Sequence, residues 1–557
     1  MNRLLLAIAL LGAGATLLVG ASCGGSGTEK GGGALKRGGV LRVGDTSDID
    51  AIDPAIAYGT TSWWLEYATA AKLFNYPDQE APAGTRLVPE VASGYKISRD
   101  GKTYTFTIRK GFRFSDGKPV TADNFKFAFD RVLNKNLNSP GAPFFIDPAA
   151  TNIVGAQALY DGKAKTARGV QARGDRLTIH LTKPSGAFLS QLAMPFVQAT
   201  PTSLPLDKSL VSVKGNALPS AGPYYVSSRV PNGGVVLKRN PFYKRGPGRS
   251  RPHNLDSVRF DGQLNPQTAY LQVLANEIDQ GPVPAANSGE VAKRFGVNKS
   301  RFWVKPQACV LYLAMNMSRP LFKDNLKLRQ AVNYILRRRE IADQSGLYGA
   351  TPYTHVLPPG VPGSQRVDPY PVDNPDVEKA KRLAKGNTRS GTANFYYFSD
   401  RPEPVAEMEI ARADLARLGI KADVRGFRGF ALFEAAGKRE SPHDITQGGW
   451  CQDYPDPYDF VNILLYGGSI HATNNVNLSY FDDPEFNRKM LAAARQVGPA
   501  RRKAYAELDA DIMKNAAPWA VTTVPNNRFV FSGRVDSRSL VYQGAYQNWS
   551  LPALALK

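Results

Sequence analysis

Stretches with the hydrophobic spacing of strands alternate with stretches that have the spacing of helices along the whole chain. Residues 104–109 and 176–181 alternate strictly between hydrophobic and polar side chains, which predicts half-buried strands, and a shorter strand is predicted at 39–43. Between the first two, the hydrophobic residues that follow Thr121 recur at helical spacing as far as Val132. This pattern predicts a helix with Thr121 as its N-cap.

Four further segments are predicted to be helical, at 62–73, 375–384, 404–418 and 484–515. Asn374 is the expected cap of the second of these, with Pro375 at the first helical position, which suits proline. Because strands and helices alternate to the C-terminus, the predicted fold class is α/β. A chain of 557 residues also exceeds what one hydrophobic core usually organises, so at least two lobes are expected.

The N-terminus has the composition of a secretory signal. Arg3 is followed by a largely apolar run of 16 residues, Leu4 to Val19, then by small residues and by Cys23. The run is too short and too rich in alanine and glycine for a membrane span. A cysteine at this place resembles the lipidation site of bacterial lipoproteins, although leucine is usual three residues before it and this chain has glycine there. We predict a signal peptide at 1–22 and a lipid on Cys23; the alternative is an ordinary signal with an incidental cysteine.

Export of the chain has consequences for the next segment and for the remaining cysteines. Eight of residues 24–39 are glycine, a composition that stays flexible, so residues 23–38 are predicted to be a tether. Cys309 and Cys451 are the other two cysteines of the sequence. In an oxidising compartment they could form one disulfide, but their spacing alone leaves this open.

The formal net charge is +22, from 70 Lys and Arg against 48 Asp and Glu. Such a balance fits nucleic acid, acidic ligands or a polyanionic envelope surface. The basic residues are scattered, however, and the longest run, 337–339, follows hydrophobic residues at helical spacing. We interpret this run as the solvated end of a helix. No nucleic-acid-binding motif occurs in the sequence, and no nucleic acid partner is expected.

Motifs for catalysis and metal binding are missing from the sequence. Neither GxSxG nor HExxH occurs, and 111–118 fails as a phosphate loop because its spacing is one residue too long and Pro119 stands where Ser or Thr is needed. The five histidines are isolated, and no CxxC or Cys/His cluster suggests zinc. We therefore predict no enzyme activity, no catalytic residue, no metal and no cofactor.

Several short motifs occur one after another along the chain, and their order is informative. The first, 112–125 (FRFSDGKPVTADNF), has the pattern of a strand, an Asp-Gly turn and a Thr-capped helix. The others are 221–224 (AGPY), 237–243 (LKRNPFY), 277–279 (EID), 316–331 with its RQA end, 357–360 (LPPG) and 418–420 (LGI). Together they resemble the family 5 solute-binding proteins, the oligopeptide- and dipeptide-type receptors of ABC importers. The resemblance covers about residues 38–557; Lys244 and Asn276 depart from it, standing where tryptophan and glycine are usual.

This resemblance implies a specific architecture. The expected fold is the two-lobed periplasmic-binding-protein-like fold (type II, cluster C), with an extra inserted domain and two hinge strands that cross between the lobes near 304–311 and 519–525. The expected divisions are lobe one at 39–75, 216–305 and 524–557, the inserted domain at 76–215, and lobe two at 306–523.

Residues 449–457 (GWCQDYPDP) carry the predicted binding site. In peptide-binding members of the family, an aspartate three residues after this tryptophan receives the free α-amino group of the ligand, and that position is Asp453. Trp450 would form a flat apolar wall of a side-chain pocket. Cys451, Gln447 and Tyr454 complete the predicted ligand-binding set. The resemblance also implies a Cys309–Cys451 disulfide beside the hinge.

The expected function follows from the resemblance. The chain would be a monomeric lipoprotein on the outer face of the bacterial cell membrane that captures peptides and delivers them to the permease subunits of an ABC transporter. Some oligopeptide receptors carry arginine where Gln447 stands, so the preferred peptide length remains open. The alternatives are a non-peptide solute, such as an oligosaccharide, an opine, haem or a metal chelate, and a surface receptor for a peptide signal.

Overall fold

A computed structural model describes residues 34–147, 151–230, 233–365 and 367–557, without the side chain of Asn216. The predicted signal peptide, Cys23 and most of the tether lie outside these residues. Residues 35–557 form one compact unit. None of the described helices is long and apolar enough to cross a membrane.

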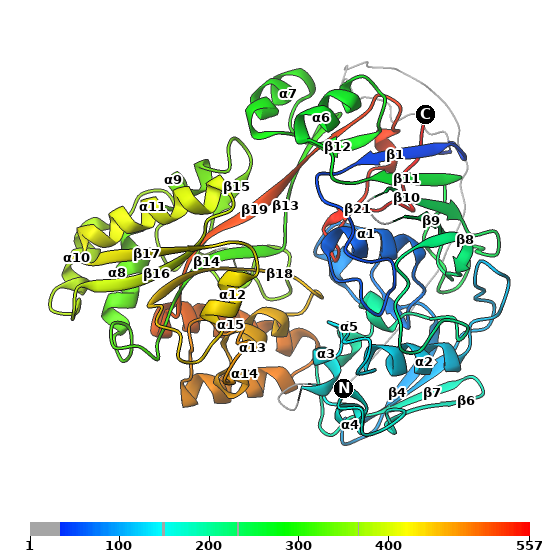
Figure 1. The fold of residues 1–557 in the computed structure, drawn as a ribbon, viewed down its shortest axis with the longest axis horizontal. Helices are drawn as coiled ribbons and strands as arrows, with labels where there is room; N and C mark the ends of the chain where they lie inside the picture. Colours follow the sequence, from blue (N-terminus) through cyan, green and yellow to red (C-terminus); the bar gives the residue numbers. More distant parts are fainter. Residues whose placement is uncertain (1–33, 148–150, 231–232, 366) are drawn as a thin grey trace, which may run out of the picture. The chain divides into compact units, whose positions relative to one another are not determined.

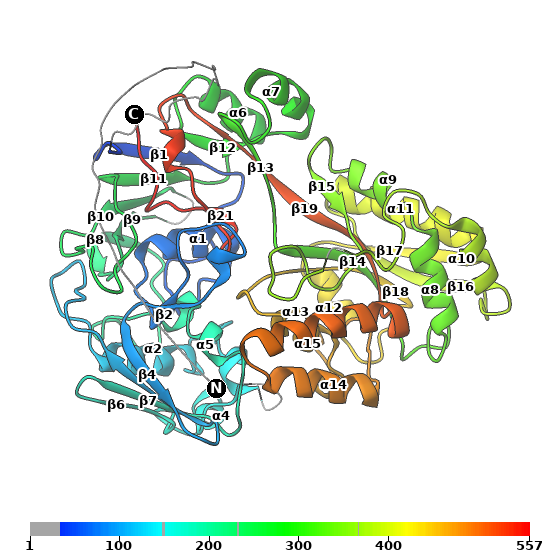
Figure 2. The ribbon, with the colours of Figure 1, turned by 180° about the vertical axis from the view of Figure 1, so that it is seen from behind.

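Thirteen strands of the described chain form one mixed sheet (Figures 1 and 2). In spatial order, they are β17 (Lys421–Phe427), β16 (Thr392–Phe398), β18 (Ile445–Cys451), β14 (Cys309–Met315), β19 (Trp519–Phe531), β12 (Gln280–Pro282), β1 (Val40–Gly44), β11 (Ser257–Asp261), β10 (Val235–Arg239), β9 (Tyr224–Arg229) and β8 (Val213–Leu218), with β13 (Phe302–Pro306) and β15 (Ala350–Pro352) also paired to β19.

The long strand β19 joins two groups of strands. Its first half pairs with β14 at Trp519–Thr523, and its second half pairs with β12 and β13 at Asn526–Phe531. We call the β12-to-β8 group with its helices lobe one, and the β14-to-β17 group with its helices lobe two. The chain also passes from β13 to β14 beside β19, so two adjacent segments link the lobes (Figure 1).

A separate four-stranded sheet belongs to the segment between β1 and β8. Its order is β4 (Ala92–Ile97), β5 (Thr103–Ile108), β7 (Arg176–His180) and β6 (Val170–Arg173), and β2 (Phe74–Asn75) pairs with β3 (Val88–Pro89) beside it. The helix α2 (Ala122–Val132) packs on this sheet. As predicted, Thr121 is its N-cap, and the Thr121 backbone N–H donates to Asn124 Oδ1 at 2.8 Å.

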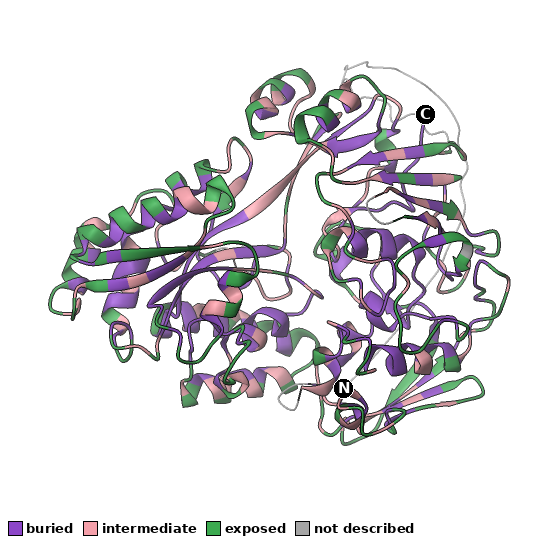
Figure 3. Ribbon diagram, in the orientation of Figure 1, coloured by how far each residue is buried: buried purple, intermediate pink, exposed green. Residues whose placement is uncertain are grey.

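Helices cover the sheets so that their buried sides face the strands and their outer sides stay exposed (Figure 3). The remaining helices are α1 (Thr60–Thr69), α3 (Pro143–Ile146), α4 (Ala156–Tyr160), α5 (Phe188–Gln191), α6 (Pro266–Leu274), α7 (Ser288–Phe295), α8 (Leu326–Ile335), α9 (Arg338–Asp343), α10 (Val377–Ala384), α11 (Pro402–Arg417), α12 (Ala431–Ala436), α13 (Tyr458–Leu465), α14 (Pro484–Arg495) and α15 (Gly498–Asp511). The predicted α/β class is confirmed.

Three helix predictions were wrong in detail. The helix predicted at 62–73 is α1, which ends at Thr69. The helix predicted at 375–384 begins at Val377, and its cap is Asp376, whose carboxylate accepts from the Lys379 N–H at 3.0 Å. The segment 484–515 is divided into α14 and α15 rather than forming one helix. The division falls before Gly498 (φ +58°) and Pro499, because proline cannot donate the N–H that a continuous helix needs.

The interpretation of 337–339 as a solvated helix end was wrong for Arg338. Its side chain is fully buried, and its guanidinium donates to the carbonyl oxygens of Val521 and Asn333 at 2.7 Å each. Burial lowers the pKa of Arg338 to about 10. Arg339, by contrast, is half-exposed and pairs with Asp373 at 2.6 Å. The middle arginine therefore ties α9 to the strand β19 that links the lobes.

Candidate functional site

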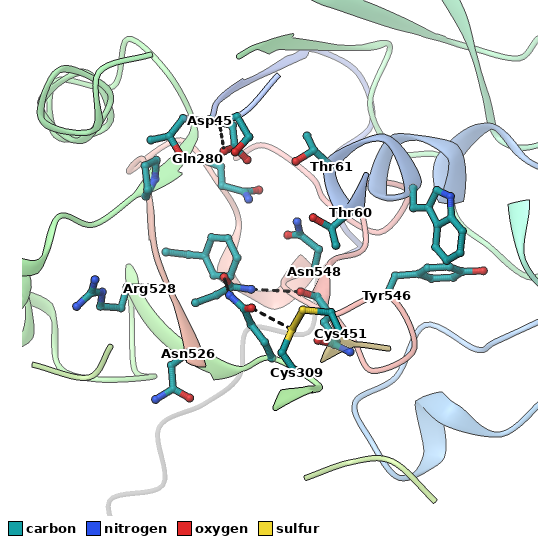
Figure 4. A pocket seen from close by; sticks show the side chains of 18 of the residues that line it. Asp45, Thr60, Thr61, Gln280, Cys309, Cys451, Asn526, Arg528, Tyr546 and Asn548 are labelled. Carbon is teal, nitrogen blue, oxygen red and sulfur yellow. Dashed lines mark hydrogen bonds between the residues drawn. A yellow bond between two sulfur atoms is a disulfide. The ribbon is translucent and has the colours of Figure 1, made fainter. Parts of the chain in front are cut away.

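A cavity of about 370 Å³ lies beside the strands that link the lobes (Figure 4). Both lobes and the linking strand contribute to its lining. The labelled residues come from lobe one (Asp45, Thr60, Thr61, Gln280), from lobe two (Cys309, Cys451), from β19 (Asn526, Arg528) and from the C-terminal segment (Tyr546, Asn548).

Local sequence explains why these segments reach the cavity. The strand β1 ends at Gly44, where a Cβ would lie 2.5 Å from Ile278, and the chain turns at Asp45 into the cavity. On the lobe-two side, a Cβ on Gly448 would lie 2.5 Å from the ring of Tyr312. Glycine at this position thus lets β18 lie close to β14 and bring its last residue, Cys451, to the cavity.

Cys309 and Cys451 form a disulfide bond at the edge of the cavity. They are paired in register at the ends of β14 and β18, and their sulfur atoms are 2.08 Å apart. The pairing implied by the family resemblance is therefore present. It ties together the two lobe-two strands next to the linking segments (Figure 4).

The cavity presents acceptors that lack donors. Gln280 Oε1 and Gln452 Oε1 are buried and have no hydrogen-bond partner among the described residues. The other end of the Gln452 side chain is engaged, since its Nε2 donates to the Ala545 carbonyl at 2.8 Å. Burial also raises the pKa of Asp45. A ligand that donates several hydrogen bonds would satisfy these groups, because buried unpaired acceptors cost free energy.

Asp453 follows directly after the cavity-lining Gln452 and contacts a second buried carboxyl group, Asp459. The Asp453 backbone N–H donates to Asp459 Oδ2 at 2.8 Å, and the Tyr58 hydroxyl of lobe one hydrogen-bonds the Asp453 carboxyl group. Burial raises the pKa values of both carboxyl groups, and the charge of Asp453 raises that of Asp459 further. We call Asp453 and Asp459 the carboxylate pair.

No cation among the described residues forms a salt bridge with the carboxylate pair. Asp453 Oδ2 and Asp459 Oδ1 are buried without a hydrogen-bond partner in the described part of the chain. The neighbouring Asp456 differs, because Arg501 binds both of its oxygens at 2.6 and 3.0 Å. The pair therefore lacks a cationic partner among the described residues, and a cationic group from outside the protein would stabilise its ionised form, which burial disfavours.

The other predicted site residues lie in different environments. Trp450 is half-buried, packs against the core and has a buried Nε1 without a partner among the described residues. Tyr454 is buried, and its hydroxyl lies 3.5 Å from Gln191 Nε2 of the segment between β1 and β8. Tyr454 thus contributes to the contact between that segment and lobe two.

Gln447 lies inside lobe two. Its side chain is 2% exposed, its Nε2 donates to Glu407 at 2.9 Å and its Oε1 accepts from the Phe398 N–H at 2.9 Å. It is not among the residues that line the cavity. These contacts give Gln447 a role in holding β18 to β16 and α11.

A second, larger cavity of about 1460 Å³ shares Gln547 with the smaller one. Gln452, which lines the smaller cavity, donates its backbone N–H at 2.9 Å to the carbonyl of Ala308, which lines the larger one. Among the charged groups of the larger cavity, Arg501 is paired with Asp456. The smaller cavity is the better candidate for the ligand-binding site because Gln452, the residue before Asp453, belongs to its lining.

Sequence reasoning missed Tyr58 and Asp459. Tyr58 lies almost 400 positions before Asp453, and no motif marks it. Asp459 is at the first turn of α13, where an acidic residue is common at any helix start. Among the described residues, no group of three or more His, Cys, Asp or Glu could hold a metal ion.

Comparison with known proteins gives consistent matches. The model of the bacterial extracellular solute-binding proteins, family 5 Middle, matches residues 86–471. The heme-binding protein A of Haemophilus influenzae is 26% identical over 84% of this chain and 83% of its own length. The periplasmic oligopeptide-binding protein OppA of Escherichia coli is 25% identical over 79% of this chain and 80% of its own length.

Solved structures have the same fold. The clavulanic acid biosynthesis oligopeptide binding protein 2 superposes with a TM-score of 0.80 at 24% identity, covering 94% of this chain and 96% of its own. The unliganded open form of the murein tripeptide binding protein MppA gives a TM-score of 0.76 at 21% identity, covering 94% and 98%.

Proposed function

Because the chain belongs to the family 5 bacterial extracellular solute-binding proteins, we propose that it captures peptides by their free amino terminus and delivers them to an ABC transporter permease. In this proposal, the peptide lies in the 370 Å³ cavity and reaches with its ammonium group past the lining residue Gln452 to the carboxylate pair, which does not itself line the cavity. A lipid on Cys23 anchors the receptor to the outer face of the cell membrane.

The observation that carries the proposal is the uncompensated carboxylate pair. Asp453 Oδ2 and Asp459 Oδ1 are buried and unpaired among the described residues. A ligand ammonium group would stabilise the ionised form of the pair and supply three donors, and hydrogen bonds between ionised groups are short and strong. The position of Asp453, three residues after Trp450, is the one that the family resemblance assigns to the ligand amine.

The rest of the cavity suits a ligand of variable sequence. Its lining is rich in amide side chains, which donate and accept hydrogen bonds without carrying charge: Gln280, Gln307, Gln452, Asn526, Asn527, Gln547 and Asn548. Such groups can bind the backbone of any peptide, while side chains contribute little to selection. We therefore expect broad sequence specificity with a strict requirement for a free amine.

The linking segments suit a hinge. The lobes are joined through β19 and the β13–β14 passage, so a rotation near Gln307 and Pro525 would move one lobe against the other. A ligand held by Tyr58 and Gln280 of lobe one and by the carboxylate pair of lobe two would stabilise one arrangement, which the permease could recognise.

Native mass spectrometry of freshly purified protein is the direct test. A retained peptide, or titration with a peptide mixture that gives stoichiometric complexes, supports the proposal. A retained sugar or opine without peptide binding would favour the non-peptide alternative, and a Soret absorption band would indicate haem. Intact mass of the membrane-extracted protein tests the anchor, since a diacylglycerol adduct on Cys23 is expected.

A further inference from the structure

The end of β10 and the connection from it to β11 concentrate positive charge. Residues 237–255 contain six Lys and Arg and no Asp or Glu. Two of the six are neutralised, since Arg251 pairs with Glu90 and Arg239 pairs with Asp256. Others in this connection, including the exposed Lys244 and Arg245, form no ion pair with any described residue.

The turn before α2 adds more cations to this surface. Arg249 lies over the Phe112 ring, 5.2 Å from its centroid, and donates to the Gly111 carbonyl. Arg249 therefore stands beside the exposed Lys110 and Arg113, which also form no ion pair with any described residue. The ring of Phe242 lies against Gly117 in the same turn and is 43% exposed.

The start of the described chain borders the same surface. The Gly38 N–H donates to the Asn254 carbonyl at 2.7 Å, which places the exposed Arg37 next to the β10–β11 connection. Burial lowers the pKa of His253 in this region, and the charges of Arg37 and Arg245 lower it further. Arg37 and Arg245 are thus close enough to act on one group.

We define the basic patch as six residues that are not ion-paired within the described chain: Arg37, Lys110, Arg113, Lys244, Arg245 and Arg249. We propose that this patch, with the exposed Phe242 beside it, docks lobe one on an anionic lipid bilayer. Clustered Lys and Arg with an exposed aromatic ring match the phosphate and interfacial layers of such a surface.

The place of the patch in the chain agrees with this partner. Arg37 is only 14 positions after Cys23, so this stretch can span at most about 50 Å. If Cys23 is lipidated, which belongs to the proposed function, the patch is held close to the bilayer. Docking through lobe one and its inserted segment also leaves lobe two free to rotate about the linking strands.

The test uses protein that lacks the lipid, so that only the surface is measured. Residues 24–557 contain the whole compact unit and can be mixed with vesicles of 30% phosphatidylglycerol in phosphatidylcholine, or of phosphatidylcholine alone. We expect sedimentation with the anionic vesicles only, and weaker binding as salt is raised. Each exposed Lys or Arg should contribute about fivefold to the affinity for anionic vesicles. R37Q/K244Q/R245Q should therefore lose on the order of 100-fold in that affinity.

A matched control removes the same charge elsewhere. Lys323, Lys327 and Lys385 are exposed on lobe two, away from the patch, and K323Q/K327Q/K385Q should keep nearly full affinity. Equal losses in both triple variants would overturn the proposal, because only net charge would then matter. Binding of a soluble polyanion such as heparin in preference to the vesicles would also overturn it and would indicate a polymer partner. Peptide titration of the same variants is independent of this result and tests the proposed function separately.

Discussion

Replacement of the carboxylate pair should have a large effect on peptide binding. Asp459 is fully buried, and each carboxyl group of the pair has one oxygen without a partner among the described residues. If a peptide ammonium group binds here, only the carboxylate pair compensates the cost of removing that ammonium group from water. An uncompensated buried charge costs about 3–5 kcal/mol. Since Asp459 remains in D453N, we expect this variant to lose about 3 kcal/mol of peptide-binding free energy, which is roughly 150-fold in affinity. D453N/D459N should lose about 5 kcal/mol, or roughly 5,000-fold.

Isothermal titration calorimetry with a tripeptide and its N-acetylated form separates this effect from general damage. The acetylated peptide lacks the ammonium group, so acetylation should weaken binding to the natural protein by several kcal/mol but should scarcely matter in D453N/D459N. The exposed Asp343 of the same lobe provides the control, and D343N should behave like the natural protein.

One result would refute the reasoning. If acetylation costs the natural protein and D453N/D459N the same free energy, the ligand amine does not interact with the pair. A loss below about 1 kcal/mol in both the single and the double variant would mean that the contact is as weak as an exposed ion pair. A cooperative melting transition and an unchanged circular dichroism spectrum would confirm that the variants are folded.

Three further predictions concern stability. Thiol titration of the unfolded, unreduced protein should find neither Cys309 nor Cys451 free, and replacing both with serine should lower the unfolding free energy by roughly 4–5 kcal/mol in urea melts, given a sequence separation of 142 residues. R338A should lower the unfolding free energy by about 3–5 kcal/mol, because the carbonyls that the buried Arg338 guanidinium binds are left unpaired. R339A should change it by less than about 0.5 kcal/mol, since Arg339 is half-exposed. Equal effects would contradict the different burial of the two arginines. The carboxylate pair has raised pKa values in the folded protein, so its contribution to stability is largest below the ordinary value of 3.8 and is lost as pH rises through the folded-state values. Melts of the ligand-free protein against pH should therefore show the natural protein losing stability relative to the double asparagine variant on going from acid to neutral pH, and parallel curves would refute this.

Local patterns in the sequence were sufficient for much of the architecture. The strands at 104–109 and 176–181 appear as β5 and β7, and Thr121 caps α2, because alternation and capping depend on neighbours within a few residues. The order of motifs identified the family, and the match over residues 86–471 confirms that resemblance.

Other features depended on the tertiary structure. The charge run 337–339 has the composition of a solvated surface, yet the fold buries Arg338 among carbonyl oxygens of distant segments. The break between α14 and α15 was missed because helical periodicity continues on both sides of Gly498 and Pro499. In each case, a contact or a single backbone restriction outweighed the local pattern.

The sequence by itself determined the α/β class, the family and the position of Asp453. Only the tertiary structure brought Asp453 against Asp459, placed Tyr58 beside them and left two carboxyl oxygens without partners among the described residues. The physical reason is that desolvation and the absence of a compensating cation are properties of a packed three-dimensional environment. Sequence can position a carboxylate in the chain, but only the fold decides whether water or another charge can reach it.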